Sequence, residues 1–176
     1  MTKETLVSLK DFIRDVPDFP KKGIVFRDVT PLLQDPAIFS QAVSLLAGPI
    51  KRMEISHVVA VESRGFIFGA PIASALNAGF VPVRKKGKLP WNTVTASYQL
   101  EYGTDTLEMH IDALPANARA LIIDDVLATG GTAKATCELV EKLKGKVVAL
   151  SFLIELTALK GRQLLQGRNV FSVIQY

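Results

Sequence analysis

The amino-acid sequence predicts an α/β protein with a central, mostly parallel, five-stranded sheet and helices on both faces. Short apolar runs typical of buried strands occur five times along the chain. Segments with helical periodicity lie between several of these runs. The 176 residues are 48% hydrophobic and 22% charged, which suits one globular domain spanning 1–176. Alternating strands and helices favour right-handed crossovers and a ligand site beyond the carboxyl ends of the strands.

The chain is predicted to begin with a helix and to continue with less regular structure. Apolar residues from Leu6 to Val16 recur at helical spacing, so a helix is expected up to about Val16. The prolines and the glycine of residues 17–36 indicate irregular structure with extended pieces. Helical periodicity returns at residues 37–52.

The remaining elements alternate between strands and helices. One helix is predicted after residue 63, and a second, amphipathic helix ends at Gly145. A basic turn, KKGKLPWN, precedes two β-prone segments separated by a glycine, which predict an antiparallel hairpin or flap at about 86–110. The five buried strands are HVVAVE (57–62), GFVPVR (79–84), ALIID (120–124), KVVALSFLIEL (146–156) and NVFSVIQY (169–176).

Charge and composition narrow the function classes. The net charge of +4 and the pI near 9.2 fit a basic pocket for a small anion as well as a nucleic-acid surface. One cysteine allows no intramolecular disulfide, and with two histidines it makes a structural zinc site improbable. No apolar run is long enough to span a membrane and no signal peptide opens the chain, so we expect a cytoplasmic protein with no membrane partner.

The stretch ALIIDDVLATGGTA carries the strongest functional signal. Asp124 and Asp125 follow a buried strand, and small, hydroxyl-bearing residues then lead into a helix. A helix N-terminus preceded by glycines forms a phosphate cradle, whereas carboxylates accept hydrogen bonds from sugar hydroxyls. Together they predict a site for a phosphorylated ribose. The alternative is an ordinary strand-to-helix turn with capping side chains. The pattern is neither a P-loop nor GxGxxG.

IIDDVLATGGT resembles the phosphoribosyl-diphosphate (PRPP) signature of type I phosphoribosyltransferases. The resemblance implies that family's fold, with an N-terminal hood at residues 1–35 and a PRPP-binding core at 36–176. It implies Mg²⁺ held mainly through PRPP, with Asp124 or Asp125 contributing directly or through water. It also implies a set of residues that bind the ribose and its 5′-phosphate: Asp124, Asp125, Ala128, Thr129, Gly130, Gly131 and Thr132.

Two further strand ends carry charged and hydroxyl groups that suit an anion. On their own, both segments also fit solvated turns, and the basic run is too short and too poor in aromatic residues to favour nucleic acid. In the family, the loop after the first strand carries diphosphate, often through a non-proline cis peptide. The resemblance therefore implies diphosphate contacts, in cis or across a dimer, at Glu62, Ser63, Arg64, Arg84, Lys85 and Lys88.

The flap and the hood resemble those of the adenine phosphoribosyltransferases. ASYQLEYG is similar to their catalytic loop, which makes Glu101 the candidate general acid or base. PDFPKKGIVFRDVTPLL resembles their hood. The resemblance implies that Phe26 and Val126 sandwich the base and that main-chain groups of Val25 and Arg27 bond its edge. Alternatively, these hood residues are core and surface residues.

The implied reaction is purine salvage: adenine and PRPP give AMP and diphosphate by Mg²⁺-dependent displacement at ribose C1 through an oxocarbenium-like transition state. The resemblance also implies a homodimer, and we expect no nucleic-acid partner. One alternative is the same chemistry on hypoxanthine, guanine, xanthine or orotate. A second is a PRPP- or purine-sensing regulator, for which the chain offers no separate helix-turn-helix domain. A third, a P-loop NTPase, lacks its motif.

Overall fold

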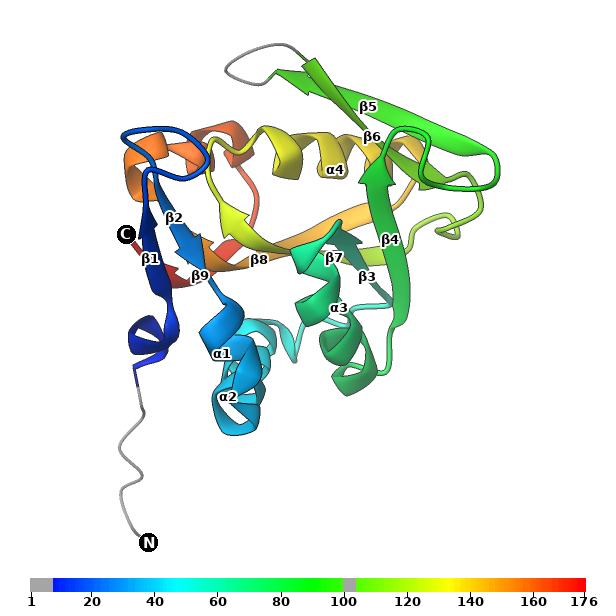
Figure 1. The fold of residues 1–176 in the computed structure, drawn as a ribbon. Coiled ribbons are helices and arrows are strands. Elements are labelled where there is room, and N and C mark those ends of the chain that lie inside the picture. The colour runs from blue at the N-terminus through cyan, green and yellow to red at the C-terminus, as the bar shows by residue number, and fades with distance from the viewer. Residues whose placement is uncertain (1–7, 100–103) are drawn as a thin grey trace, which may run out of the picture. The chain divides into compact units, whose positions relative to one another are not determined.

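The computed structural model describes residues 8–99 and 104–176, and the chain forms two compact units (Figure 1). The first unit extends to Ser44, and the second runs from Leu45 to Tyr176. None of the helices in these described ranges is long and apolar enough to cross a membrane.

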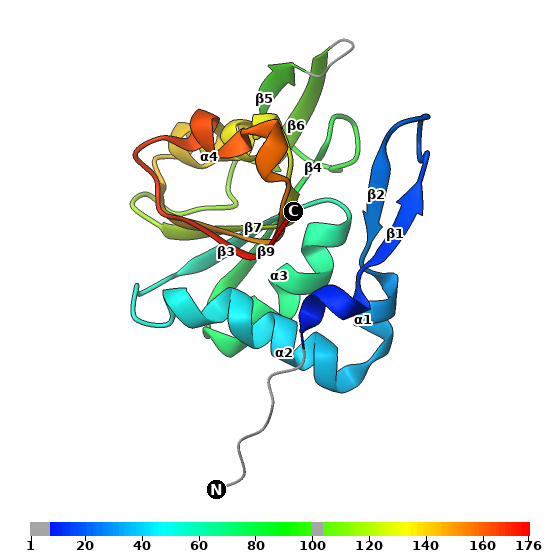
Figure 2. The ribbon, with the colours of Figure 1, turned by 90° about the vertical axis from the view of Figure 1, so that its left-hand side faces the viewer.

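The first unit is built around a short antiparallel hairpin, visible in Figure 2. Strand β1 (Arg14–Pro17) pairs with β2 (Val25–Asp28), and the rings of Phe19 and Phe26 meet edge to face with centroids 5.2 Å apart. Ion pairs Arg14–Asp28 and Arg27–Asp15 bridge the strands. The predicted helix up to Val16 is therefore wrong at its end, because pairing with β2 outweighs the local helical pattern.

Short helices flank this hairpin. A 3-10 helix, η1 (Leu9–Phe12), precedes it, and α1 (Thr30–Gln34) and α2 (Pro36–Ala47) follow it. The Asp35 carboxylate accepts hydrogen bonds from the N–H groups of Ala37 and Ile38 at 2.9 and 3.0 Å, which caps the start of α2.

The second unit contains a seven-stranded sheet in the order β5-β6-β4-β3-β7-β8-β9. The five neighbouring strands β4, β3, β7, β8 and β9 are parallel to one another, which confirms the predicted five-stranded core. The predicted flap hairpin, β5–β6, joins this core antiparallel to β4 and extends it to seven strands. The strands are β3 (His57–Val61), β4 (Gly79–Lys85), β5 (Thr93–Gln99), β6 (Thr104–His110), β7 (Arg119–Leu127), β8 (Lys146–Glu155) and β9 (Val170–Gln175).

The helices α3 (Arg64–Ala75) and α4 (Gly131–Lys142) lie on opposite faces of this sheet (Figure 1). Three further 3-10 helices complete the unit: η2 (Gly48–Ile50), η3 (Thr157–Leu159) and η4 (Gly161–Leu165). Because helices cover both faces, the central strands are largely apolar, and Val59, Ile122 and Leu150 are fully buried.

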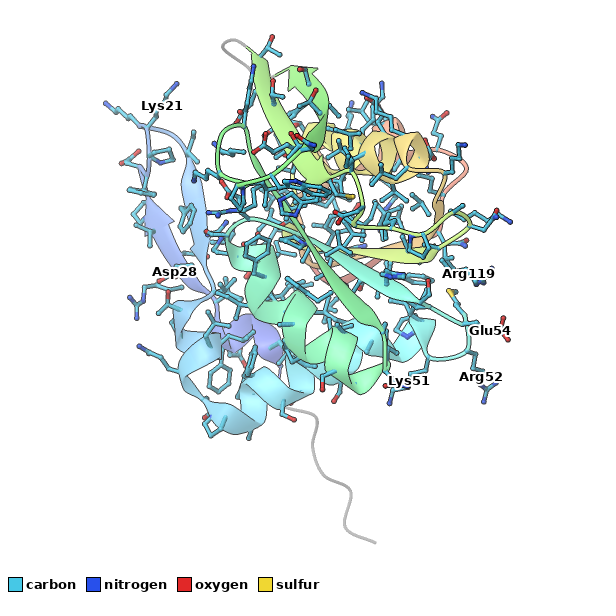
Figure 3. The ribbon with its side chains drawn as sticks, turned by 90° about the vertical axis from the view of Figure 1, so that its right-hand side faces the viewer. Lys21, Asp28, Lys51, Arg52, Glu54 and Arg119 are labelled. Carbon is cyan, nitrogen blue, oxygen red and sulfur yellow. The ribbon has the colours of Figure 1, made fainter. Side chains whose placement is uncertain are left out.

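The two ends of the sheet differ. At the amino end of β7, Arg119 donates from Nε to the carbonyl of Glu54 at 2.9 Å and from an Nη to that of Met53 at 2.7 Å, which ties down the turn before β3 (Figure 3). At the carboxyl ends of β3, β4 and β7 lie the charged residues singled out from the sequence. The fold therefore separates a structural end from a candidate functional end.

Candidate functional site

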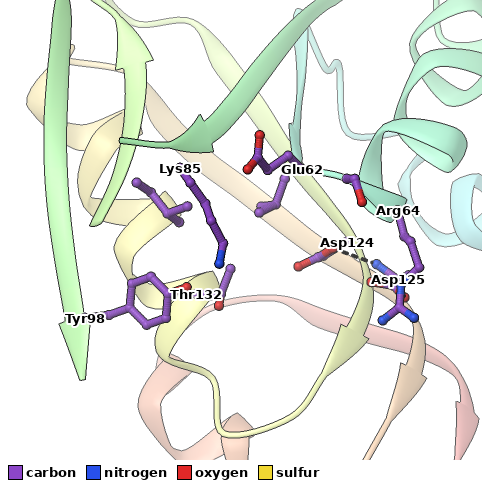
Figure 4. Close-up of a pocket in the computed structure, with 10 residues that line it drawn as sticks. Glu62, Arg64, Lys85, Tyr98, Asp124, Asp125 and Thr132 are labelled. Atoms are coloured by element: carbon purple, nitrogen blue, oxygen red, sulfur yellow. Dashed lines mark hydrogen bonds and ion pairs between the residues drawn. The ribbon is translucent and has the colours of Figure 1, made fainter. Parts of the chain in front are cut away.

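A pocket of about 430 Å³ opens at the carboxyl ends of β3, β4 and β7. In Figure 4, Arg64 and Asp125 lie on one side, Lys85 and Tyr98 on the other, and Asp124 between them. Seven of the predicted site residues therefore line one space: Glu62, Ser63, Arg64, Lys85, Asp124, Asp125 and Thr132. Among the residues that the structure describes, the lining is Val61, Glu62, Ser63, Arg64, Lys85, Tyr98, Leu107, Asp124, Asp125 and Thr132.

The two adjacent acids lie within β7, which continues to Leu127 instead of ending at them. The Asp125 N–H donates to Asp124 Oδ1 at 2.9 Å, and Arg64 Nε lies 2.6 Å from Asp125 Oδ2. Burial, and then the charge of Asp125, raise the pKa of Asp124 well above its usual value. Burial also raises the pKa of Asp125, although Arg64 opposes this. Such a pair is poised to accept donors such as sugar hydroxyls.

The segment after β7 forms a smaller hollow of about 50 Å³ at the start of α4. Gly130 adopts φ of +86°, a left-handed conformation that glycine permits, and it occupies the N-cap position. Having no side chain, it supplies no acceptor to the N–H groups of the first helical turn. Ala128, Thr129, Gly130 and Thr132 line this hollow, whose glycine-rich helix start suits a phosphate.

A second loop supports this hollow from behind, and the sequence did not reveal it. A Cβ on Gly161 would lie 2.1 Å from the carbonyl oxygen of Ala128, and a Cβ on Gly130 would lie 2.4 Å from the carbonyl oxygen of Gly161. The two backbones can approach this closely only because both residues are glycine. The loop from Ala128 to Thr132 is thus shaped by a segment about thirty residues further along the chain.

The supporting loop is itself held by an ion pair between the exposed Arg162 and the buried carboxylate of Glu155. Arg162 donates to both oxygens of Glu155 at 2.9 and 2.5 Å, and the Ser172 hydroxyl donates to the same carboxylate at 2.6 Å. Arg162 and Ser172 hold the pKa of Glu155 below its usual value despite burial. Such a bidentate pair fixes the backbone that follows β8.

The carboxylate of Glu62, which lines the pocket, gathers two of the predicted cations, and all three residues line an adjoining space of about 420 Å³. Arg84 Nε and Lys88 Nζ lie 2.8 and 2.9 Å from the two oxygens of Glu62, whose side chain is only 6% exposed. Burial raises the pKa of Glu62, but hydrogen bonds from Lys88 and Arg84 outweigh it and lower that pKa. The structure therefore gives Glu62 a positioning role. The Glu62–Ser63 peptide is cis, as the resemblance implied.

The flap hairpin supplies two further groups that the sequence did not single out. Asp105 Oδ2 lies 3.0 Å from Lys85 Nζ and 3.4 Å from the Tyr98 hydroxyl, which also hydrogen-bonds to Thr132. The Lys85 ammonium lowers the pKa of Asp105. Strand alternation placed these residues in a hairpin, but only the fold brings them against α4 and the pocket.

The described residues do not test every predicted contact with the base or the flap. Glu101 lies outside the described residues. Val25, Phe26 and Arg27 lie on β2 in the first unit, whereas Val126 lies on β7 in the second and lines the smaller hollow. The predicted base contact between these groups stays a prediction.

Within the described residues, no group of three or more potential metal-ligating side chains is present. The acids Asp124 and Asp125, which line the pocket, nevertheless fit a hard cation that keeps most of its ligands from water and substrate oxygens. Chemically, the pocket can hold an anion at each end and hydroxyl groups between them.

Comparisons with known proteins agree with this geometry. A family model for the phosphoribosyl transferase domain matches residues 29–173. The adenine phosphoribosyltransferase of Carboxydothermus hydrogenoformans is 58% identical over 97% of this chain and 100% of its own. The crystal structure of the Rhodothermus marinus adenine phosphoribosyltransferase is 57% identical and superposes with a TM-score of 0.92 over 96% of both chains. That of Saccharomyces cerevisiae, complexed with an imino-altritol bisphosphate and adenine, is 41% identical over 94% of this chain and 96% of its own, with a TM-score of 0.89.

Proposed function

The chain belongs to the phosphoribosyl transferase family, and from that premise we propose that it makes AMP and diphosphate from adenine and PRPP. The observation that carries this proposal is the order of groups along one edge of the sheet. A glycine-rich helix start, a pair of carboxylates and a set of cations follow one another at the strand ends. This order matches the 5′-phosphate, the ribose and the diphosphate of PRPP.

On the ribose side, we assign the 5′-phosphate to the loop from Ala128 to Thr132. The hydroxyls of the ribose bond to Asp124 and Asp125. Their charge lies near the ring carbon that becomes positive as the diphosphate leaves, so it also stabilises the oxocarbenium-like transition state. Arg64 separates from Asp125 and turns its planar fork to the diphosphate when PRPP binds.

On the leaving-group side, Ser63, Arg84, Lys85 and Lys88 bind the departing diphosphate, and Glu62 holds Arg84 and Lys88 in place. Stabilising charge that develops on the leaving group lowers the barrier to displacement. Mg²⁺ bound with PRPP supplies further positive charge to the diphosphate, and Asp124 or Asp125 would help to hold it.

Selection of adenine belongs to the hood, residues 1–35, acting with the core at 36–176. Phe26 and Val126 sandwich the ring, and the main chain of Val25 and Arg27 bonds its edge. The yeast relative, whose crystal structure contains adenine, supports this assignment by its 41% identity over most of the chain. We further propose that the protein is a cytoplasmic homodimer.

Glu101 is proposed as the group that moves the proton of the purine during attack by N9. We expect Glu101→Gln to lower kcat about 100-fold, because Gln cannot take up or give a proton. The KM for PRPP should change little. Rapid-quench kinetics of AMP formation provides the measurement, and an unchanged single-turnover rate would remove Glu101 from the chemistry.

Base competition tests the proposed function. The purified protein is incubated with PRPP, Mg²⁺ and equal amounts of adenine, hypoxanthine, guanine and orotate, and the nucleotides are separated by chromatography. AMP as the dominant product supports the proposal. IMP, GMP or OMP instead would keep the PRPP site but reject the adenine assignment, and PRPP binding without any nucleotide would favour a sensor.

A further inference from the structure

We propose that Glu108 is a positioning residue for diphosphate, acting through the backbone of the basic turn at residues 85–89. This inference rests on the proposed function, which assigns the cations of that turn to the diphosphate. Glu108 touches none of the reacting groups in the described contacts, so its effect passes through Lys85 and Lys88.

The Glu108 carboxylate is buried at the centre of the turn. The residue is 4% exposed and lies on β6 directly opposite Arg84 of β4. Its Oε1 accepts hydrogen bonds from the N–H groups of Lys88 and Leu89, both at 3.1 Å, and its Oε2 accepts one from the Thr93 hydroxyl at 3.4 Å. The N–H of Gly87 bonds to it as well. A single carboxylate thus binds three successive backbone N–H groups.

These bonds set the conformation of the turn. The chain reverses at Gly87, where φ is +82°, and the Lys86 N–H donates to the carbonyl of Thr106 at 3.0 Å. The Lys88 carbonyl, in turn, accepts a bond from Arg84 at 3.0 Å. Without the Glu108 acceptor, the Lys88 N–H would keep only its bond to the Lys85 carbonyl at 3.2 Å, the N–H groups of Gly87 and Leu89 would lose the acceptor described above, and the turn would rearrange to reach water.

Glu108 differs in one respect from the other two carboxylates near the turn. Glu62 and Asp105 bind the charged ends of Arg84, Lys88 and Lys85, so an incoming diphosphate competes with them for those cations. Glu108 binds backbone N–H groups and a hydroxyl, and diphosphate does not compete for these contacts. It can therefore hold the turn in the same shape before and after the ligand binds, which lowers the ordering cost of binding.

Two substitutions separate hydrogen bonding from charge. Glu108→Leu removes every acceptor at similar volume, whereas Glu108→Gln keeps one oxygen for the N–H groups and turns its amide toward Thr93. Calorimetry with diphosphate and Mg²⁺ should show affinity weakened ~10- to 100-fold in E108L and less than about threefold in E108Q. Affinity for ribose 5-phosphate should stay unchanged in both. Asp112→Asn, at an exposed carboxylate on the turn after β6, serves as the matched control and should change neither affinity.

The proposal fails if folded E108L binds diphosphate as wild type does, or if E108L weakens both ligands equally. Equal losses in E108Q and E108L would show that charge, and not the backbone contacts, is responsible, which also overturns it. Hydrogen exchange on the wild-type protein needs no variant: the amides of Gly87 and Leu89 should be protected with and without diphosphate, and unprotected amides would contradict the account. If the wild type itself binds no diphosphate, the proposed function fails instead.

Discussion

The two sides of the pocket are built by different means. The proposed ribose-phosphate side, residues 124–132, is one continuous stretch whose backbone and small side chains line the hollow at the start of α4. The proposed diphosphate side gathers long cationic side chains around the buried carboxylate of Glu62. The backbone of Gly161 packs against the first, whereas the second is held by ion pairs for which an anionic ligand can compete. Shape should therefore control one side, and charge placement the other.

The largest effect is expected from adding a side chain at Gly161, where its backbone packs against the loop from Ala128 to Thr132. Gly161→Ala places a methyl group 2.1 Å from the carbonyl oxygen of Ala128, so the loop must move. A shift of about 1 Å in a positioning loop can cost roughly 100-fold in rate, and we expect that loss in kcat/KM for PRPP. Steady-state kinetics is the measurement. Gly48→Ala, where no atom lies within 4 Å of the added methyl, is the control.

A Gly161→Ala enzyme with wild-type kinetics would show that the phosphate loop is not braced from behind.

A smaller effect, on the KM for PRPP, is expected from changing Glu62, which holds the cations of the proposed diphosphate side. Glu62→Gln weakens the ion pairs that hold Arg84 and Lys88, and it also removes a negative charge beside an anion site. Because two cations already neutralise this buried carboxylate, positioning should dominate, and KM for PRPP should rise about 10-fold. KM for adenine should not change. Tighter PRPP binding instead would mean that Glu62 only screens the cations.

The smallest effect concerns stability and pH. The raised pKa of Asp124 means that the folded state binds its proton more tightly than the unfolded state does. Stability contributed by this group is therefore greatest at low pH and falls as pH rises from the unfolded pKa of about 4 toward the folded value. Asp124→Asn should raise Tm at neutral pH by ~2–4 °C, corresponding to about 1 kcal/mol, while weakening PRPP binding.

Thermal unfolding at pH 5 and pH 8 checks this, and the gain should be larger at the higher pH. The acids with lowered pKa values behave in the opposite way. Stability from Glu62 and Glu155 is present at neutral pH and falls as pH drops through their folded pKa values. Because this loss affects the wild type and the variant alike, the Tm of the variant is compared with the Tm of the wild type at each pH. A lower Tm for Asp124→Asn would contradict the raised pKa.

The same contrast explains what could be predicted from the sequence. The residues of the proposed ribose-phosphate side are contiguous, so the order strand, Asp124, Asp125, glycines, helix was enough to predict the loop between β7 and α4, while its ligand stays a prediction. The parallel core followed from its apolar runs, which the structure confirms. The supporting contacts could not be predicted, because Gly161 and Glu108 act on residues that are distant along the chain. The strand Arg14–Pro17 was missed for the same reason, since its partner lies beyond the turn at Gly23.

Calorimetry of each variant with each ligand tests most directly whether the two sides of the pocket bind the two ends of PRPP. Wild type, Gly161→Ala and Glu62→Gln are each titrated with ribose 5-phosphate and, separately, with diphosphate and Mg²⁺. We predict that Gly161→Ala loses affinity for ribose 5-phosphate alone and that Glu62→Gln loses affinity for diphosphate alone. Equal losses of both ligands in either variant would contradict the assignment of the two sides to the two ends of PRPP.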